Sequence, residues 1–413
     1  MSNKKETLVI IYRSLLVGGI ENYVTNIMHN ALKSNKRVIW ICNKDMLYSS
    51  LYQNIIEETQ IEVKRINYSG LNIYKLPNMS FAKDENIKIM VFDIFRLFQA
   101  YKIKNRYKTN NIDILYCVPH FTGSSIFPHQ VFKGKCTKKI VKKLFARIYN
   151  NIYKQGNLYF FSSKHYHAIQ DNYEIHFISP NNYLVPELEN REKYDEASFR
   201  KVYNSRNFTI ISPGRFEFPH KGYLIGLIKI YGELKPLYPQ LKLLIIGDGP
   251  DKDKVEMVIE ELPKAYSKDI DILSPQSLED LKCKMKTVNL NISVAGCASL
   301  GARMGLITLP ARHYVYDCEV YGFFPNSRNL TTETKPGEPA KQYIEQVINM
   351  DEEEYIHYSK LAYHTFDDEL YNVNFPFVEH HISNYIPSKW DFCFVKWTYN
   401  ILRLKYLIAR LKK

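Results

Sequence analysis

The chain has 413 residues, which is the length of two domains of ordinary size. Hydrophobic residues make up 45% of the sequence, as in globular proteins, so the composition excludes a disordered chain. The formal net charge of +13 at pH 7 favours an anionic partner and leaves three classes open, namely a nucleotide-sugar, a nucleic acid or an acidic membrane surface.

The cysteines and the first residues of the chain indicate the cellular compartment of the protein. The seven cysteines are scattered without a CxxC or any other metal-ligand spacing, which is typical of reduced thiols in a cytosolic protein. The first residues, MSNKKETLVIIYRSLLVGG, carry a short apolar run with no small-residue cleavage site, so we expect no signal peptide. No apolar run reaches the roughly 18 residues of a membrane span. We expect a cytoplasmic protein, either soluble or peripheral on the inner face of the membrane.

The first half of the chain predicts an alternation of strands and helices. Apolar runs at Thr7–Tyr12, Arg37–Cys42, Asp113–Val118 and Asn157–Ser163 favour buried strands. Between the first strand and a helix from about Ile20, the pair Gly18 and Gly19 lets the backbone approach a ligand, although such a pair is also typical of a plain turn.

A histidine follows the third of these strands. His120 comes just past Val118, where a side chain can reach the crevice at the carboxyl end of a parallel sheet. The alternative is a histidine that only closes a hydrogen bond within its loop.

Lys133–Tyr153 predicts a basic amphipathic helix. Its apolar residues recur at Ile140, Leu144, Ile148 and Ile152, and lysines crowd the rest of its surface. Two interpretations remain open: a docked helix with a solvated face, or a contact with anionic lipid or a lipid-linked acceptor.

A polar, proline-containing stretch at 180–196 is the best candidate for a linker. We therefore expect an N-terminal domain over 1–190, a second domain over 191–375, and a C-terminal tail over 376–413.

The most informative stretch is Phe208–Pro250. It predicts a strand at Phe208–Ser212, a helix at Tyr223–Lys235 and a second strand at Leu241–Ile246, which together make a βαβ unit. The loops at the strand ends carry Gly214, Arg215, Lys221, Gly247 and Gly249. Cationic side chains beside bare backbone N–H groups suit the oxygens of a phosphate.

The chain continues in the same alternating pattern. We expect a strand at Val288–Val294, a loop of small residues at Ala295–Ser299, a helix at Leu300–Met304 and a strand at Leu306–Leu309. Backbone N–H groups of the loop ending at Ser299 are positioned to meet a phosphate at the start of that helix.

The tail from Lys389 to Lys413 predicts a basic amphipathic helix. Its apolar residues form one narrow stripe, and they are Trp390, Phe394, Trp397, Ile401, Leu404, Ile408 and Leu411. Six Lys or Arg follow Lys389, and Asp391 is the only acid. The helix either packs across the first domain or lies on an acidic leaflet.

The run SPGR, a short gap, HKG, an amphipathic helix and LLIIGDGP resembles the second-domain signature of family 4 glycosyltransferases. The resemblance implies the α/β fold called GT-B, with two facing Rossmann-like domains, parallel sheets and a C-terminal helical tail. It assigns Arg215 and Lys221 to the diphosphate of a nucleotide-sugar donor and His120 to the transferred sugar. The glycines at Gly18, Gly19, Gly214, Gly247 and Gly249, with Ser299, would complete the donor site.

The resemblance also implies a reaction. The enzyme would move a sugar, with retention of anomeric configuration, from a nucleotide diphosphate sugar to a glycan acceptor, free or lipid-linked, in bacterial surface polysaccharide synthesis. It needs no metal and no cofactor, because the nucleotide-sugar is a co-substrate and Arg and Lys replace a cation. Nucleic acid is not expected as a partner, because the chain has no matching motif.

One departure from the family leaves an alternative open. Most members carry two Glu in the last strand–loop–helix, at the positions of Ile292 and Leu300, and no Asp or Glu occurs from Val288 to Tyr316. Asp317 and Glu319 lie further on. The alternative is a non-catalytic GT-B-like subunit that binds a partner enzyme or a glycan.

Overall fold

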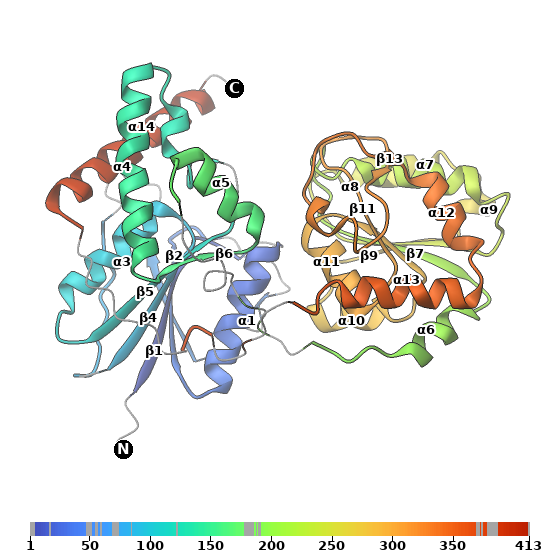
Figure 1. The fold of residues 1–413 in the computed structure, drawn as a ribbon, viewed down its shortest axis with the longest axis horizontal. Coiled ribbons are helices and arrows are strands. Elements are labelled where there is room, and N and C mark those ends of the chain that lie inside the picture. Colours follow the sequence, from blue (N-terminus) through green and yellow to red (C-terminus); the bar gives the residue numbers. More distant parts are fainter. Residues whose placement is uncertain are drawn as a thin grey trace. The chain divides into compact units, whose positions relative to one another are not determined.

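The structure is a computed structural model. It describes residues 5–15, 18–46, 52–53, 57, 60–67, 74–83, 85–120, 123–176, 186, 188, 191–368, 372, 375–377 and 387–411. For residues 409–411 it describes the backbone alone. The chain forms two compact units (Figure 1). The first consists of Met1–Leu16, Ile20–Asn190 and Leu370–Lys413, and the second of Val17–Gly19 and Arg191–Glu369. Most of the expected linker at 180–196 lies outside the described residues.

A six-stranded parallel sheet forms the centre of the first unit, in the order β3-β2-β1-β4-β5-β6. The strands are β1 (Glu6–Ile11), β2 (Arg37–Asn43), β3 (Ile61–Ile66), β4 (Asn86–Val91), β5 (Asn111–Val118) and β6 (Leu158–Phe160). The helices are α1 (Gly19–Lys33), α3 (Ile94–Arg106), η2 (Pro128–Val131), α4 (Lys135–Lys154) and α5 (Ser163–Tyr173). The expected strands are therefore confirmed.

Both faces of this sheet are buried, which is why its strands read as continuous apolar runs. Along β1, Val9 belongs to a core shared with α3, α4 and α5, whereas Ile10 belongs to a core shared with α1. Residues that alternate along one strand thus serve two separate apolar layers.

A five-stranded parallel sheet forms the second unit, in the order β11-β10-β7-β8-β9. The strands are β7 (Phe208–Pro213), β8 (Leu241–Ile246), β9 (Ile270–Leu273), β10 (Leu290–Ser293) and β11 (Thr308–Pro310), and a short antiparallel pair joins β12 (Glu319–Val320) to β13 (Glu338–Pro339). The longer helices are α6 (Glu196–Tyr203), α7 (Tyr223–Leu234), α8 (Lys252–Glu260), α10 (Leu278–Met285), α11 (Ala295–Met304), α12 (Ala340–Ile348) and α13 (Glu352–His364). The βαβ unit expected at Phe208–Pro250 is confirmed as β7-α7-β8.

The small-residue loop expected at Ala295–Ser299 is wrong, because α11 already begins at Ala295. The small side chains of this segment show no apolar period from which a helix could be predicted. They are needed because α11 lies close to the sheet. A Cβ added to Gly301 would overlap the side-chain amide of Asn291 on β10. Ala298 and Ala302 are fully buried on the same face.

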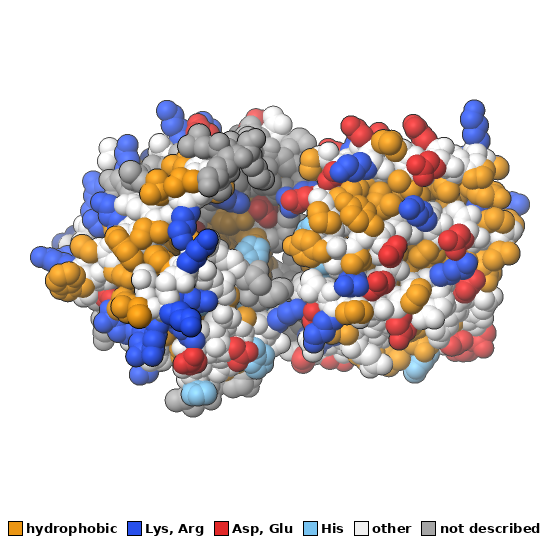
Figure 2. Space-filling model, turned by 90° about the horizontal axis from the view of Figure 1, so that it is seen from above, with side chains coloured by type: hydrophobic (Ala, Val, Ile, Leu, Met, Phe, Trp, Pro, Cys, Tyr) orange, Lys and Arg blue, Asp and Glu red, His pale blue; other side chains and the backbone are white. Residues whose placement is uncertain are grey.

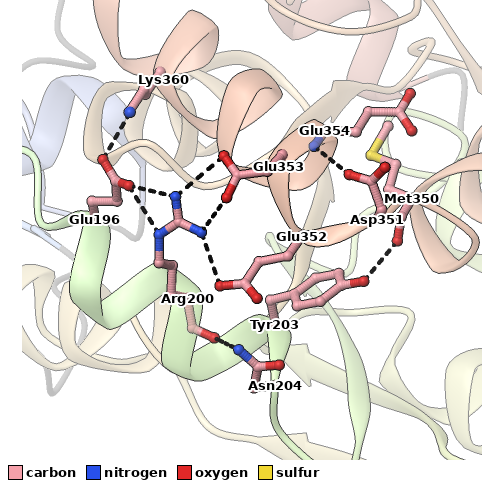
Figure 3. Close-up of polar contacts among 10 residues, drawn as sticks. All are labelled: Glu196, Arg200, Tyr203, Asn204, Met350, Asp351, Glu352, Glu353, Glu354 and Lys360. Carbon is pink, nitrogen blue, oxygen red and sulfur yellow. Dashed lines mark hydrogen bonds and ion pairs between the residues drawn. The ribbon is translucent and has the colours of Figure 1, made fainter.

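A network of ion pairs joins the first and last helices of the second unit (Figure 3). The guanidinium of Arg200 on α6 lies 2.9 Å from Glu352 and 2.7 Å from Glu353, both on α13, and 2.8 Å from Glu196. Lys360 on α13 lies 2.7 Å from Glu196. These contacts tie the start of the unit to its end.

The tail forms α14 (Lys389–Leu411), which contacts α3 and η2 of the first unit. Its packed face holds Asp391, Val395 and Thr398, all of them buried. The hydroxyl of Tyr74 donates to the carbonyl of Phe392 over 2.7 Å, and Arg147 on α4 forms an ion pair with Asp391. Among the described helices, none combines the length and the apolar character needed to cross a membrane.

Candidate functional site

The carboxyl edge of the second sheet brings three connections together. β7 pairs with both β8 and β10, so the strand order reverses between β7 and β10. In open parallel sheets ligands bind outside the carboxyl ends of the strands at such a reversal. The loop after β7 carries Arg215 and Lys221, and α11 begins two residues after the end of β10.

Main-chain hydrogen bonds join the loop after β7 to the loop after β8. The N–H of Gly214 donates to the carbonyl of Ile246 over 2.9 Å, and the N–H of Phe216 donates to the carbonyl of Asp248 over 2.9 Å. The N–H of Asp251 returns a bond to Phe216 over 3.1 Å. The loop that carries both cations is therefore held in place before any ligand arrives.

Two of the candidate glycines are required by this join. A Cβ on Gly247 would overlap the carbonyl oxygen of Gly214, and a Cβ on Gly249 would overlap that of Phe216. The close contact between the two loops therefore explains why these positions are glycine, without a ligand. Gly214 differs, since the nearest atom to an added Cβ would be the hydroxyl of Tyr223 at 3.8 Å.

Lys221 is the central cation of this edge. Its side chain packs on Gly214, where an added Cβ would lie 3.9 Å from Cδ and 4.0 Å from Cε of the lysine. Burial lowers the pKa of Lys221. Within the described residues, no carboxylate forms an ion pair with its ammonium. Lys221 is partly buried, and a partly desolvated ammonium without an anion marks a place where an anion would be stabilised.

Arg215 and His220 add further nitrogen groups to the same loop. The Arg215 side chain is 41% exposed and forms an ion pair with Glu217. Its charge helps to lower the pKa of Lys221, so the two cations lie near one another. Burial lowers the pKa of His220, and Lys221 and Arg215 lower it further. The loop is thus electropositive, although part of the Arg215 charge is already neutralised.

The N-terminus of α11 adds backbone donors. The N–H of Ala295 donates to the carbonyl of Thr331 over 2.7 Å, whereas those of Gly296 and Cys297 have no partner among the described residues. The Lys221 ammonium offsets part of the burial that raises the pKa of the Cys297 thiol, so Lys221 and Cys297 are neighbours. Ser299 lies in the second turn of α11, beyond these free donors.

Core residues occupy the two positions at which the resemblance led us to look for acids. Ile292 is fully buried in β10, and Leu300 packs against the core of the second unit. Of the two later acids, Glu319 accepts bonds from Arg312 and from the N–H of Gly337, at 2.9 and 2.8 Å. Asp317 is exposed. Glu319 therefore has a structural role in the β12–β13 pair.

A cluster of rings beside Lys221 was not anticipated from the sequence. The ring of His220 lies 4.9 Å from that of His313 and 4.9 Å from that of Tyr314. Tyr314 is 59% exposed. Its N–H donates to the carbonyl of His220 over 3.3 Å. The available signal was the run Arg312 to Tyr316, which follows the last strand of the sheet and carries three aromatic or imidazole rings.

Of the remaining candidates, Gly18 and Gly19 belong to the second unit and His120 to the first. Gly19 is the first residue of α1, and a Cβ there would meet nothing within 4 Å, so no steric demand explains the glycine. His120 follows β5 and is exposed, although partial desolvation and the charge of Arg13 lower its pKa. Beside it, burial lowers the pKa of His165 to about 4, and this ring bonds the carbonyl of Pro119 over 3.0 Å.

Solved structures with the same fold cover nearly the whole chain. A glycosyltransferase from Rickettsia africae is 16% identical, with 90% of this chain and 95% of that chain covered at a TM-score of 0.53. HepE from Anabaena, solved in complex with UDP and glucose, is 13% identical, with 88% and 95% covered at 0.53. The N-terminal domain of trehalose-6-phosphate phosphatase from Candida albicans is 10% identical, with 89% and 94% covered at 0.51.

These likenesses confirm the expected fold class, an α/β fold of the GT-B type with two Rossmann-like units and a helical tail. No protein-family model matches the sequence, and comparison with curated proteins gives no match. The chemistry of the site must therefore be argued from its own residues.

Proposed function

We propose that this protein is a glycosyltransferase that moves a sugar from a nucleotide diphosphate sugar to a glycan acceptor. The observation that carries the proposal is the ammonium of Lys221, which belongs to a partly buried side chain, has no described carboxylate partner and lies near Cys297 in the first turn of α11, where N–H groups are free. A diphosphate satisfies both the charge and the donors. The complex of HepE with UDP and glucose supports the choice, since that protein shares the fold.

The proposed role of the cations is to stabilise the leaving group. Negative charge builds on the diphosphate as the glycosidic bond breaks, and fixed positive groups at that position lower the barrier. Lys221 is held in place by its packing on Gly214. Arg215 must exchange its present partner Glu217 for the phosphate. No metal is required in this scheme, and the anomeric configuration is retained.

The acceptor side of the reaction is assigned to the first unit. We propose that His120 contacts the transferred sugar, with the turn at Gly18 and Gly19 near the donor phosphate. A largely neutral imidazole suits that task, and both partial desolvation and Arg13 favour the neutral form of His120. A glycan of a bacterial surface polysaccharide, free or lipid-linked, is the proposed acceptor.

A second candidate function rests on one specific observation. Ile292 and Leu300 occupy the positions where most family 4 members carry acids, and both are packed in the core. A GT-B-like subunit that binds a partner enzyme or a glycan without turnover would need no acids there. Binding and turnover must therefore be measured separately.

Calorimetry with UDP, GDP, ADP and CMP tests the proposal. We expect one diphosphate to bind the wild type and Lys229→Ala equally, since Lys229 is exposed on α7 of the same βαβ unit. Lys221→Ala should abolish that binding. If Lys221→Ala binds as tightly as the wild type, the proposed donor site is wrong. Binding of a diphosphate without transfer from any matching nucleotide-sugar would favour the non-catalytic subunit.

A further inference from the structure

Four residues of the apolar stripe predicted for the tail are exposed along α14. Trp390 is 83% exposed, Leu404 58% and Ile408 45%. Trp397, between them, is also exposed at 46%. Side chains of this size are rarely left in water in a row along one helix, so the stripe is a candidate interaction surface.

The helix is held by a different face, so the exposure does not come from loose packing. Val395 and Thr398 are fully buried, and Asp391 is fixed by Arg147 and by the hydroxyl of Ser388 at 2.7 Å. These residues lie about a quarter turn or more away from the exposed Trp390, Leu404 and Ile408 on a helical wheel. Phe394 and Ile401 of the stripe pack against the core of the first unit, with the ring of Phe394 5.5 Å from that of Phe145, whereas Trp390, Leu404 and Ile408 stay exposed.

The stripe continues onto the start of α4. The ring of Trp397 stacks on that of Phe132 at 5.6 Å, and the ammonium of Lys405 donates to the carbonyl of Val131 over 2.6 Å. Every residue from Lys133 to Ile140 is exposed, and Ile140 itself is 59% exposed. The exposed apolar residues of the two helices thus belong to one end of the first unit.

Basic residues surround these apolar side chains. Between Val131 and Lys154 the chain has eight Lys or Arg and no acid. The one acid of α14 is Asp391, which is buried against Arg147. One acid from another segment, Glu174 at the end of α5, forms an ion pair with Lys142. Figure 2, which looks onto this end of the first unit, shows blue side chains around orange ones with few red ones between.

We propose that this end of the first unit docks on an anionic lipid bilayer, with α14 lying in the plane of the interface. The docking face consists of Trp390, Trp397, Leu404, Ile408 and Ile140, together with Lys133, Lys135, Lys138 and Lys139. Apolar and tryptophan side chains enter the boundary between headgroups and acyl chains, while the lysines meet the phosphates. Charge complementarity selects the bilayer, because the face offers no acid to a protein partner of mixed charge. This inference does not depend on the proposed sugar transfer.

Vesicle flotation of the full chain tests the apolar half of the face. We expect wild type to float with vesicles of phosphatidylcholine and phosphatidylglycerol, and Leu404→Gln/Ile408→Gln to partition about tenfold less. Leu237→Gln/Met257→Gln is the matched control, because these residues are 64% and 60% exposed in the second unit. Failure of wild type to float, or equal flotation of the two double variants, would overturn the proposal.

The charged half of the face is tested by Lys138→Glu/Lys139→Glu on α4. We expect binding to anionic vesicles to fall about tenfold or more and to weaken with added salt. Lys229→Glu/Lys264→Glu, with both positions exposed in the second unit, should bind as wild type. Equal binding to purely phosphatidylcholine vesicles would contradict the role of charge. Thermal midpoints close to wild type show that each variant is folded.

Tryptophan fluorescence reports the position of the face directly. The chain has three Trp, and Trp40 is fully buried, so a change on adding vesicles comes from Trp390 or Trp397. A blue shift with anionic vesicles, and quenching by lipids brominated near the headgroup, are the expected results. An unchanged spectrum with floated protein would place the contact elsewhere and overturn the assignment of this face.

Discussion

The carboxylate of Asp251 accepts a hydrogen bond from the N–H of Phe218 over 2.7 Å. It also forms an ion pair with Lys254 at 2.7 Å, and the two contacts lower its pKa. Asp251 thus fixes the middle of the loop that carries Arg215 and Lys221, although it follows a different strand.

Removing this contact should weaken nucleotide binding without removing a cation. We expect Asp251→Ala to reduce the affinity for the bound diphosphate roughly fivefold, because the loop loses one charge-assisted hydrogen bond. Asp253→Ala, at an exposed position in the first turn of α8, should bind as the wild type. Calorimetry compares the two, and equal affinities would show that the loop does not need Asp251.

Two glycines differ in the space around them, so replacing each by alanine should change the stability in opposite directions. Gly247→Ala should destabilise the protein by about 3 kcal/mol, because the new Cβ overlaps the Gly214 carbonyl oxygen. Gly296→Ala should instead stabilise it by up to about 1 kcal/mol, since nothing lies within 4 Å of the new atom and the residue is helical. Urea unfolding measures both, and similar destabilisation by the two changes would contradict the described loop geometry.

The pKa of Lys221 predicts an alkaline limit for donor binding. Burial lowers this pKa below its usual 10.5, and binding of a diphosphate requires the protonated form. Affinity should therefore fall as the pH rises through the lowered pKa, with net proton uptake on binding in that range. Calorimetry in buffers of different ionisation enthalpy detects the uptake, and binding without it would exclude Lys221 from the site.

Turnover should depend on the cations and not on a metal. Lys221→Ala should reduce turnover on the order of a hundredfold or more, as loss of one fixed donor does at other sites of developing charge. Chelation by EDTA should leave the wild-type rate unchanged. A rate that falls with EDTA and recovers with a divalent cation would overturn the proposed division of roles.

The ion pairs in Figure 3 should stabilise the second unit only above mildly acidic pH. Lys360 and then Arg200 lower the pKa of Glu196 below its usual 4.5, and Arg200 lowers that of Glu353. A carboxyl whose pKa is lowered by folding adds stability above its unfolded pKa and loses it as the pH falls through the folded value. Arg200→Leu should therefore lower the urea midpoint at pH 7 and have little effect at about pH 3. An equal loss at both pH values would indicate lost packing rather than charge.

The sequence was sufficient for the parts of the fold that bury continuous apolar runs. The strands around Val9 and Leu243 were predicted because both faces of each sheet are covered. The start of α11 was not, because its buried residues are small and carry no period. The donor residues of the loop after β7 stay predictions, although their burial and charge could be described.

The tail shows why periodicity alone did not identify the contact face. The apolar residues of α14 predicted one stripe, and Phe394 and Ile401 of it do pack against the first unit, but the most buried residues of the helix are Asp391, Val395 and Thr398. A buried carboxylate was acceptable there because Arg147 neutralises it. Such a pairing between segments far apart in sequence leaves no local pattern to read.

The join between the loops after β7 and β8 consists of main-chain groups, apart from the bond to Asp251. Side chains that point outward from this frame can be exchanged over evolutionary time without loss of its shape. The frame therefore accepts apolar residues such as Ile292 and Leu300 and rings such as His313 and Tyr314 around it while its own hydrogen bonds stay the same.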